Sequence, residues 1–108
     1  MPGVAVMCCT IGEDRRPNCE TAFEWPQGYG FGEATQRVMR EFRVSEDIYP
    51  QVREGRLRRT VRWVLPSRQN TPEVEAAFAR ISQAAQSMCS DGTMEIDPAT
   101  GDIIVRVP

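Results

Sequence analysis

Apolar positions along the chain change period several times, and each change predicts a new element. The run Val4–Ile11 is almost continuously apolar and predicts a buried strand. Gly12–Gly30 is rich in proline, glycine and charge, and its pattern supports at most a short strand at Thr21–Trp25, which Pro26 ends. The N-terminal third therefore predicts one buried strand followed by an irregular segment.

A helix is predicted next, over about Gly32–Arg43. Phe31, Ala34, Val38 and Phe42 recur at spacings of three and four residues and make one apolar stripe. The arginines of this segment fall off the stripe. We therefore expect the stripe to face the core.

Two strands joined as a hairpin are expected in the middle of the chain. Ser45–Arg53 has Ile48 and Val52 on one side, and Glu54–Gly55 follows it as a turn. In Leu57–Leu65, apolar side chains on one face alternate with arginine and threonine on the other. The polar face of this second strand should meet solvent or a partner.

The clearest helix opens at Asn70–Glu73. Pro72 suits a first helical turn, and the acids Glu73 and Glu75 complement the positive end of the helix dipole. Asp91–Gly92 ends the helix. Its buried face should consist of the residues at helical spacing, namely Val74, Ala77, Phe78, Ile81, Ala84, Ala85 and Met88.

The C-terminal residues predict a second hairpin, with Thr93–Asp97 and Asp102–Val107 on either side of Pro98–Gly101. The predicted order is strand, helix, two strands, helix, two strands, in a single domain over residues 1–108. We expect an α+β fold in which a mostly antiparallel sheet of about four to five strands is backed by two helices.

Composition narrows the function classes. Hydrophobic residues make up 41% of the 108 residues and charged residues 26%, which favours a soluble globular domain over a membrane span or wholesale disorder. Histidine is absent, so the commonest general base and metal ligand is missing. We therefore expect no catalytic residue, no metal and no cofactor.

The cysteines favour a reduced interior. No basic segment precedes the N-terminal apolar run and no small-residue cleavage site follows it, so the cytoplasm is the expected location and reduced thiols are the expected state. We interpret Cys8, Cys9, Cys19 and Cys89 as small hydrophobic side chains. Cys8 and Cys9 point to opposite faces of a strand, which argues against a zinc site.

Charge is distributed unevenly. Residues 28–68 carry nine arginines and five acidic residues, net +4, whereas residues 69–108 carry two arginines and six acidic residues, net −4. This dipolar layout favours oriented docking on a partner over counterion-release binding to nucleic acid, which requires a basic stripe that acids do not offset.

Two loops have the composition of ligand sites. Gly28–Gly32 precedes a helix, where backbone amides approach anions, but no phosphate-loop or dinucleotide pattern follows it. Asp97, Thr100 and Asp102 place oxygens around a turn, without the ligand number of a calcium loop. We interpret the first as a helix-entry loop and the second as a hairpin turn.

From Leu57 onward the chain resembles the C-terminal half of the YbjN-like family, bacterial sensory-transduction regulators whose fold is similar to that of type III secretion chaperones. The resemblance rests on the strand Arg59–Leu65, on an amphipathic helix, and on Gly92–Asp97, which turns at Thr100–Gly101 into Ile103–Arg106. It implies an α+β domain that binds other proteins and has no catalytic residues.

The leading hypothesis is a non-catalytic protein-binding module, either a chaperone-like adaptor or a small phage or mobile-element inhibitor of a host protein complex. A second copy of the chain is a further candidate partner. The alternative is a nucleic-acid-binding protein that uses the arginine-rich strand. An enzyme acting through a cysteine thiolate is least favoured, because no histidine is present to activate it. The predicted partner-binding residues are Arg53, Arg56, Arg58, Thr60 and Arg62.

Overall fold

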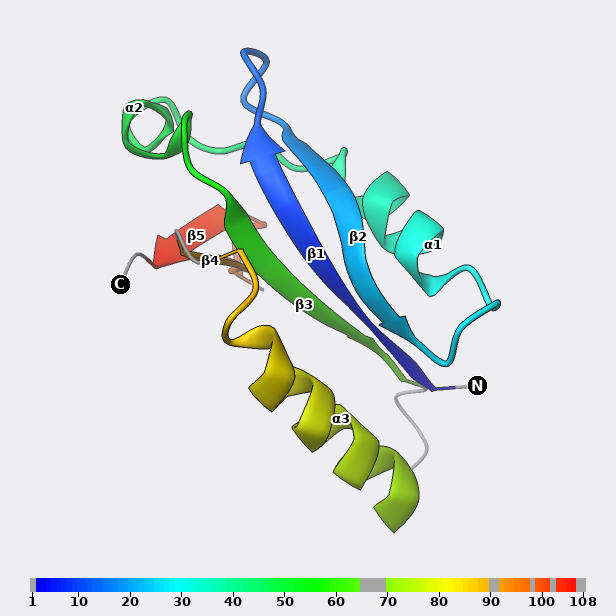
Figure 1. Cartoon of the computed structure of the whole chain (residues 1–108). Helices are drawn as coiled ribbons and strands as arrows, with labels where there is room; N and C mark the ends of the chain where they lie inside the picture. The colour runs from blue at the N-terminus through cyan, green and yellow to red at the C-terminus, as the bar shows by residue number, and fades with distance from the viewer. Residues whose placement is uncertain (1, 65–69, 90–91, 98, 102, 107–108) are drawn as a thin grey trace.

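A five-stranded mixed sheet carries three helices in the computed structural model, which describes residues 2–64, 70–89, 92–97, 99–101 and 103–106 (Figure 1). The α+β class and the mostly antiparallel sheet expected from the sequence are confirmed. In chain order the elements are β1 (Gly3–Ile11), β2 (Pro17–Trp25), α1 (Phe31–Met39), α2 (Tyr49–Val52), β3 (Leu57–Trp63), α3 (Pro72–Ala85), β4 (Thr93–Ile96) and β5 (Ile103–Arg106).

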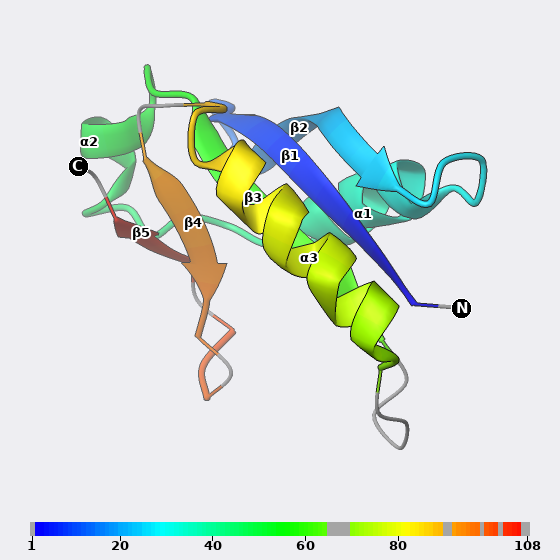
Figure 2. The ribbon, with the colours of Figure 1, turned by 60° about the horizontal axis from the view of Figure 1, so that its bottom comes forward.

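Helices cover both faces of the sheet. Figure 2 shows α3 across β1 and β3 on one face, and α1 on the opposite face against β1 and β2. Because β1 is covered on both sides, Val4, Ala5, Val6 and Met7 are all fully buried. This double burial accounts for the continuous apolar run of β1, since a strand covered on one face alternates apolar and polar residues.

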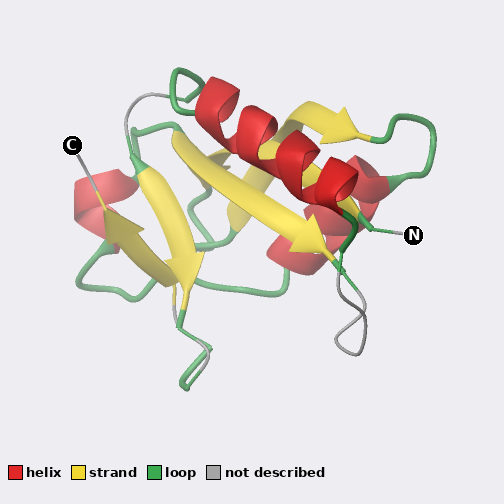
Figure 3. Cartoon of the chain, turned by 90° about the horizontal axis from the view of Figure 1, so that it is seen from below, coloured by secondary structure: helices red, strands yellow, loops and turns green. Residues whose placement is uncertain are grey.

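The strand order is β2-β1-β3-β4-β5. β1 pairs antiparallel with both β2 and β3, and β4 pairs antiparallel with β5. β3 and β4 run parallel, and their described register consists of the single pair Arg58 and Thr93. Figure 3 shows the two strands starting side by side and then diverging. The β4–β5 hairpin is therefore joined to the rest of the sheet over a short contact.

The main core fills the α1 side of the sheet, where the odd-numbered residues of β1 point. On the α3 side, Phe78 is fully buried and meets Trp25 edge to face, with ring centroids 6.1 Å apart. The buried cluster on the α1 side consists of Ala5, Met7, Cys9, Ile11, Cys19, Met39, Val44, Val52, Leu57, Met94 and Ile103.

The start of α3 follows its sequence signals. The Thr71 side chain accepts a hydrogen bond from the amide of Val74, and Pro72 occupies the first turn. Phe78 of the predicted apolar face is buried, whereas Ala84 is exposed. Among the described residues, no helix is both long and apolar enough to cross a bilayer.

The prediction of a strand at Ser45–Arg53 is wrong. The segment forms a turn and the one-turn helix α2. Ile48 and Val52 are four residues apart, a spacing that puts two side chains on one side of a strand and on one side of a helix alike. Pro50 fits the first turn of a helix, where no amide hydrogen bond is needed. The predicted hairpin with β3 therefore does not form.

β2 is also longer than predicted, because it begins at Pro17 rather than at Thr21. Pro17 and Cys19 are buried and alternate with the exposed Asn18 and Glu20, so the strand alternates over a stretch whose composition predicts an irregular segment. The observed order is two strands, two helices, a strand, a helix and two strands. Several predicted positions, namely Leu65, Asp91, Pro98, Asp102 and Val107, lie outside the described residues.

The buried face of α1 is rotated from the predicted stripe. Val38 is 41% exposed, whereas Thr35 and Met39 are each 1% exposed. The Thr35 hydroxyl donates to the carbonyl oxygen of Phe31 at 2.7 Å and accepts from the Trp63 indole nitrogen at 2.9 Å. A hydroxyl with both partners inside the protein can be buried at little cost, so this polar residue takes a position on the core side.

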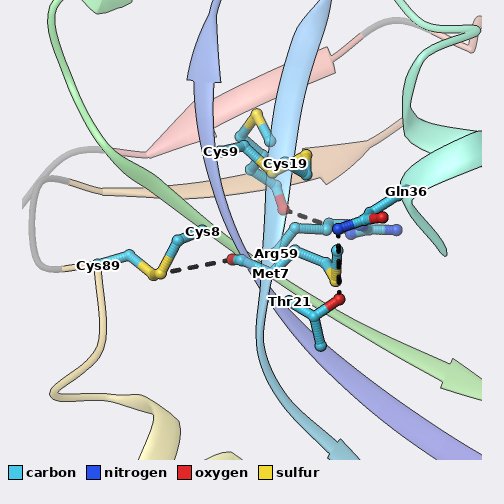
Figure 4. Close-up of a disulfide and its surroundings, with 9 residues drawn as sticks. Met7, Cys8, Cys9, Cys19, Thr21, Gln36, Arg59 and Cys89 are labelled. Atoms are coloured by element: carbon cyan, nitrogen blue, oxygen red, sulfur yellow. Dashed lines mark hydrogen bonds between the residues drawn. A yellow bond between two sulfur atoms is a disulfide. The ribbon is translucent and has the colours of Figure 1, made fainter. Parts of the chain in front are cut away.

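Two disulfides join the four cysteines, so the expected reduced thiols are wrong. Cys9 is bonded to Cys19, its direct partner on β2, and Cys8 is bonded to Cys89, which follows α3 (Figure 4). Neighbouring residues of a strand point to opposite faces, so the two bonds tie β1 to different elements on different sides. The partners are 10 and 81 residues apart in the chain, and their contact depends on the tertiary fold.

Candidate partner-binding cleft

One edge of β3 is open over most of its length. The amide of Arg58 donates to the carbonyl oxygen of Gly92 at 2.8 Å, on the side away from β1. Backbone groups alternate between the two edges of a strand, so the N–H and C=O groups of Thr60 and Arg62 point to that same side. Within the described part of the chain, no strand pairs with β3 there beyond Arg58. This edge is therefore a row of backbone donors and acceptors without a strand partner.

A polar cleft of about 310 Å³ lies alongside this edge, between β3, α3 and the start of β4. It forms because β4 turns away from β3 after their first contact, while α3 continues across the sheet. The residues that line it include Arg58, Arg59 and Thr60 of β3, Ser82 and Gln86 from the α3 side, and Glu95 of β4.

Two arginines of β3 are held by the fold on the α3 side. Nη1 of Arg58 donates to the carbonyl oxygen of Ala85 at 2.6 Å. The guanidinium of Arg62 lies over the ring of Phe78, 5.2 Å from its centroid. Neither arginine forms an ion pair with another described residue. Both therefore keep free charge and N–H donors while their positions are fixed.

Arg59 points to the opposite face of β3, where it lies near Met7 and Gln36 in Figure 4. Its Nη1 donates to the carbonyl oxygen of Met94 at 3.4 Å, and its buried Nε has no hydrogen-bond partner among the described residues. Burial lowers the pKa of Arg59 from its ordinary value, and the neighbouring Glu95 opposes part of that shift. A buried donor without an acceptor is uncommon in native proteins, so Arg59 is a candidate binding residue.

The five predicted residues are only partly brought together. Arg58, Thr60 and Arg62 share one face of β3 as expected, but α3 lies against this face, and Arg58 and Thr60 are half-buried. Arg53 and Arg56 are exposed and precede β3, between α2 and the strand. Arg58 and Thr60 line the cleft.

Sequence reasoning missed Arg59 as a site residue. Its signal was present, because Arg59 is a charged residue placed between Leu57 and Val61 on the face assigned to the core. The open edge had no sequence signal, since it depends on where β4 diverges from β3.

The chain itself occupies the anion position of the glycine-rich loop. A carboxylate oxygen of Glu24 accepts a hydrogen bond from the amide of Gly32 at 2.9 Å, at the N-terminus of α1, where a bound anion would lie. A Cβ atom at residue 32 would overlap the side chain of Thr21. Glycine is therefore required at position 32 because α1 packs closely on β2 there.

A second hollow, almost entirely apolar, lies on the other side of α3. It measures about 250 Å³ and is lined by Phe23 of β2 and by Arg80, Ile81, Ala84 and Met88. Small-molecule sites usually measure about 300–1,000 Å³. The hollow therefore fits a single apolar side chain better than a cofactor.

The side chains that line the cleft offer charged and hydrogen-bonding groups. In the described part of the chain, no three cysteine or acidic side chains come together as a metal site would require. Comparison of the chain with protein-family models, with curated proteins and with solved structures finds no match. The resemblance to the YbjN-like family stays a prediction.

Proposed function

We propose that this chain is a non-catalytic protein-binding module and that the cleft beside β3 is its binding surface. The observation that supports this most is the combination of Arg58 and Arg62, positioned but not neutralised, with an open strand edge between them. Fixed charges orient a partner, and an open edge offers it backbone hydrogen bonds. The absence of histidine from the sequence fits a role without acid–base chemistry.

A protein is favoured over nucleic acid as the partner. Glu95 lies in the cleft itself, and one N–H group of Arg58 is already bound to Ala85. Phosphate backbones require a continuous basic groove, usually with aromatic faces for the bases. A cleft of mixed charge fits a protein segment better. The two forms proposed from the sequence, an adaptor and a small inhibitor, would use such a surface equally.

We further propose that the protein works in an oxidising compartment. Both disulfides join residues that the fold brings into contact, and disulfides persist in oxidising surroundings while they are rare in the cytosol. This proposal differs from the cytoplasm that the sequence predicts.

Photo-cross-linking from the cleft tests the proposed function. A photoreactive residue replaces Ser82 on the cleft wall, and in a matched control it replaces Arg37 on the exposed side of α1. In the native source, the variant at position 82 should cross-link to a defined protein that resists nuclease treatment, and the variant at 37 should not. Adding Arg62→Glu should reduce the cross-link.

The same preparation distinguishes the alternative. If the purified protein binds oligonucleotides at physiological salt, with affinity that falls steeply as salt rises, and if capture disappears after nuclease treatment, the nucleic-acid hypothesis replaces the protein-binding one.

A further inference from the structure

We infer that β3 accepts an extended segment of its partner as an added strand, in the wedge between β3 and β4, and that this segment alternates acidic and apolar residues. The inference rests on the proposed function and specifies the shape and chemistry of the partner. Strand addition to an exposed edge is a general mode of peptide recognition, in which main-chain hydrogen bonds give affinity and alternate side chains give specificity.

The edges of the sheet differ in how well they are protected. β2 forms one outer edge, and a register shift opposite Val6 and Met7 interrupts it. A bulge of this kind blocks pairing with another chain. The register of β3 with β1 is regular from Leu57 to Trp63, and no bulge interrupts it. The unpaired edge of β3 therefore lacks the bulge that interrupts β2.

The two faces of β3 set the pattern of the added strand. On the α3 side, Arg58 and Arg62 carry charges without an acidic partner among the described residues. On the other side, Val61 and Trp63 are half-buried, because α1 packs mainly against β1 and β2, and the Trp63 indole already bonds to Thr35 of α1. Side chains of neighbouring strands meet on the same face. A segment with acids on one face and apolar residues on the other matches both sides at once.

Arg59 supplies a second and independent observation. Its guanidinium stands where β4 leaves β3, and its buried Nε lacks an acceptor in the described structure. The nearby Glu95 is already paired with Arg106, at 3.5 Å. A main-chain carbonyl oxygen of the incoming segment would provide the missing acceptor at the end of the wedge.

Nuclear magnetic resonance with a defined peptide tests the inference on the disulfide-bonded protein. The probe is a blocked hexapeptide of alternating glutamate and valine, and the matched control is its lysine–valine counterpart. The glutamate peptide should shift the amide signals of Thr60 and Arg62 more than those of α1, and the lysine peptide should not. Absence of a shift at Thr60 and Arg62 at about 1 mM peptide overturns strand addition.

Two N-methylated forms of the peptide give the sharper comparison. Methylation of alternate residues removes either the N–H groups that would face β3 or those that would face away from it. One form should lose binding and the other should retain it, because only one set of amides pairs with the edge. Equal binding by both forms contradicts backbone pairing.

A variant of the protein addresses the same edge. The N–H of Thr60 points away from β1, so Thr60→Pro removes an edge donor without removing a bond to β1. Affinity for the glutamate peptide should fall about five- to tenfold, as expected for one hydrogen bond, while Thr60→Val should bind like the wild type. If Thr60→Pro does not fold, the N-methylated peptides decide the question.

The two proposals fail separately. Suppose that the photoreactive residue at position 82 cross-links to the same protein with and without Thr60→Pro, and that the peptide does not shift the amide signals of Thr60 and Arg62. Protein binding then stands and strand addition fails. If neither the cross-link nor the peptide shift is found, both are wrong.

Discussion

Nη1 of Arg58 donates a hydrogen bond of 2.6 Å to the carbonyl oxygen of Ala85, the last residue of α3. The final carbonyl groups of a helix lack helical partners and lie at the negative end of its dipole. The guanidinium therefore fixes the end of α3 against β3, beside the cleft. A residue proposed for partner binding thus also supports the fold.

Replacing Arg58 should reveal its contribution to the stability of the fold. We expect Arg58→Ala to lower the free energy of unfolding by about 1–2 kcal/mol, because a charge-assisted hydrogen bond at the helix end is lost. Arg53→Ala, at an exposed position, should change it by less than about 0.5 kcal/mol. Urea unfolding measures both. Equal effects of the two substitutions would show that the bond to Ala85 contributes nothing to stability.

Arg59 should behave in the opposite way. Arg59→Met keeps an apolar stem and removes the buried Nε, which lacks a partner among the described residues, so the free energy of unfolding should stay the same or rise by up to about 1 kcal/mol. Binding of the glutamate–valine peptide should weaken at the same time. A loss of stability above about 1 kcal/mol, measured by urea unfolding, would identify the guanidinium as a structural group.

The disulfides should make a large contribution to stability. We expect Cys8→Ala with Cys89→Ala, and separately Cys9→Ala with Cys19→Ala, to cost about 2–5 kcal/mol each. The first pair should cost more, since its sequence separation is 81 residues against 10. Thermal and urea unfolding measure the costs. Mass spectrometry after alkylation provides the check on pairing, because four alkylated cysteines in the unreduced protein would contradict both bonds.

Close packing of α1 on β2 predicts a coupled pair of substitutions. A Cβ at residue 32 would overlap Thr21, so Gly32→Ala should cost about 1–3 kcal/mol. Thr21→Ala removes the atoms that it would meet and should restore part of the loss. A double-mutant cycle by urea unfolding measures the coupling, and strictly additive effects would mean that the two residues do not meet in solution.

Several parts of the fold could be predicted from the sequence because their signals are local. The continuous apolar run of β1 and the proline and acids that open α3 act within a few residues of where they stand. The same holds for the C-terminal hairpin, in which alternating residues flank a turn. The arginine face of β3 follows from strand alternation alone, so three of the predicted site residues do lie together.

Other features depended on contacts between distant segments. The spacing of Ile48 and Val52 fits a strand and a helix equally. Packing of these residues against the core therefore determined that the segment forms the helix α2. Thr35, and not Val38, lies on the buried side of α1, because the indole of Trp63 on β3 donates a hydrogen bond to its hydroxyl.

The cysteine pairs and the cleft have the same origin. Cys8 meets Cys89 only because α3 returns its C-terminal end to β1. The open edge of β3 exists because β4 keeps one register pair and then turns away. The sequence by itself determined the periodic elements and the placement of charge along them. Tertiary structure decided which side chains gain a partner and which backbone groups are left without one, because both depend on segments that local periodicity does not relate.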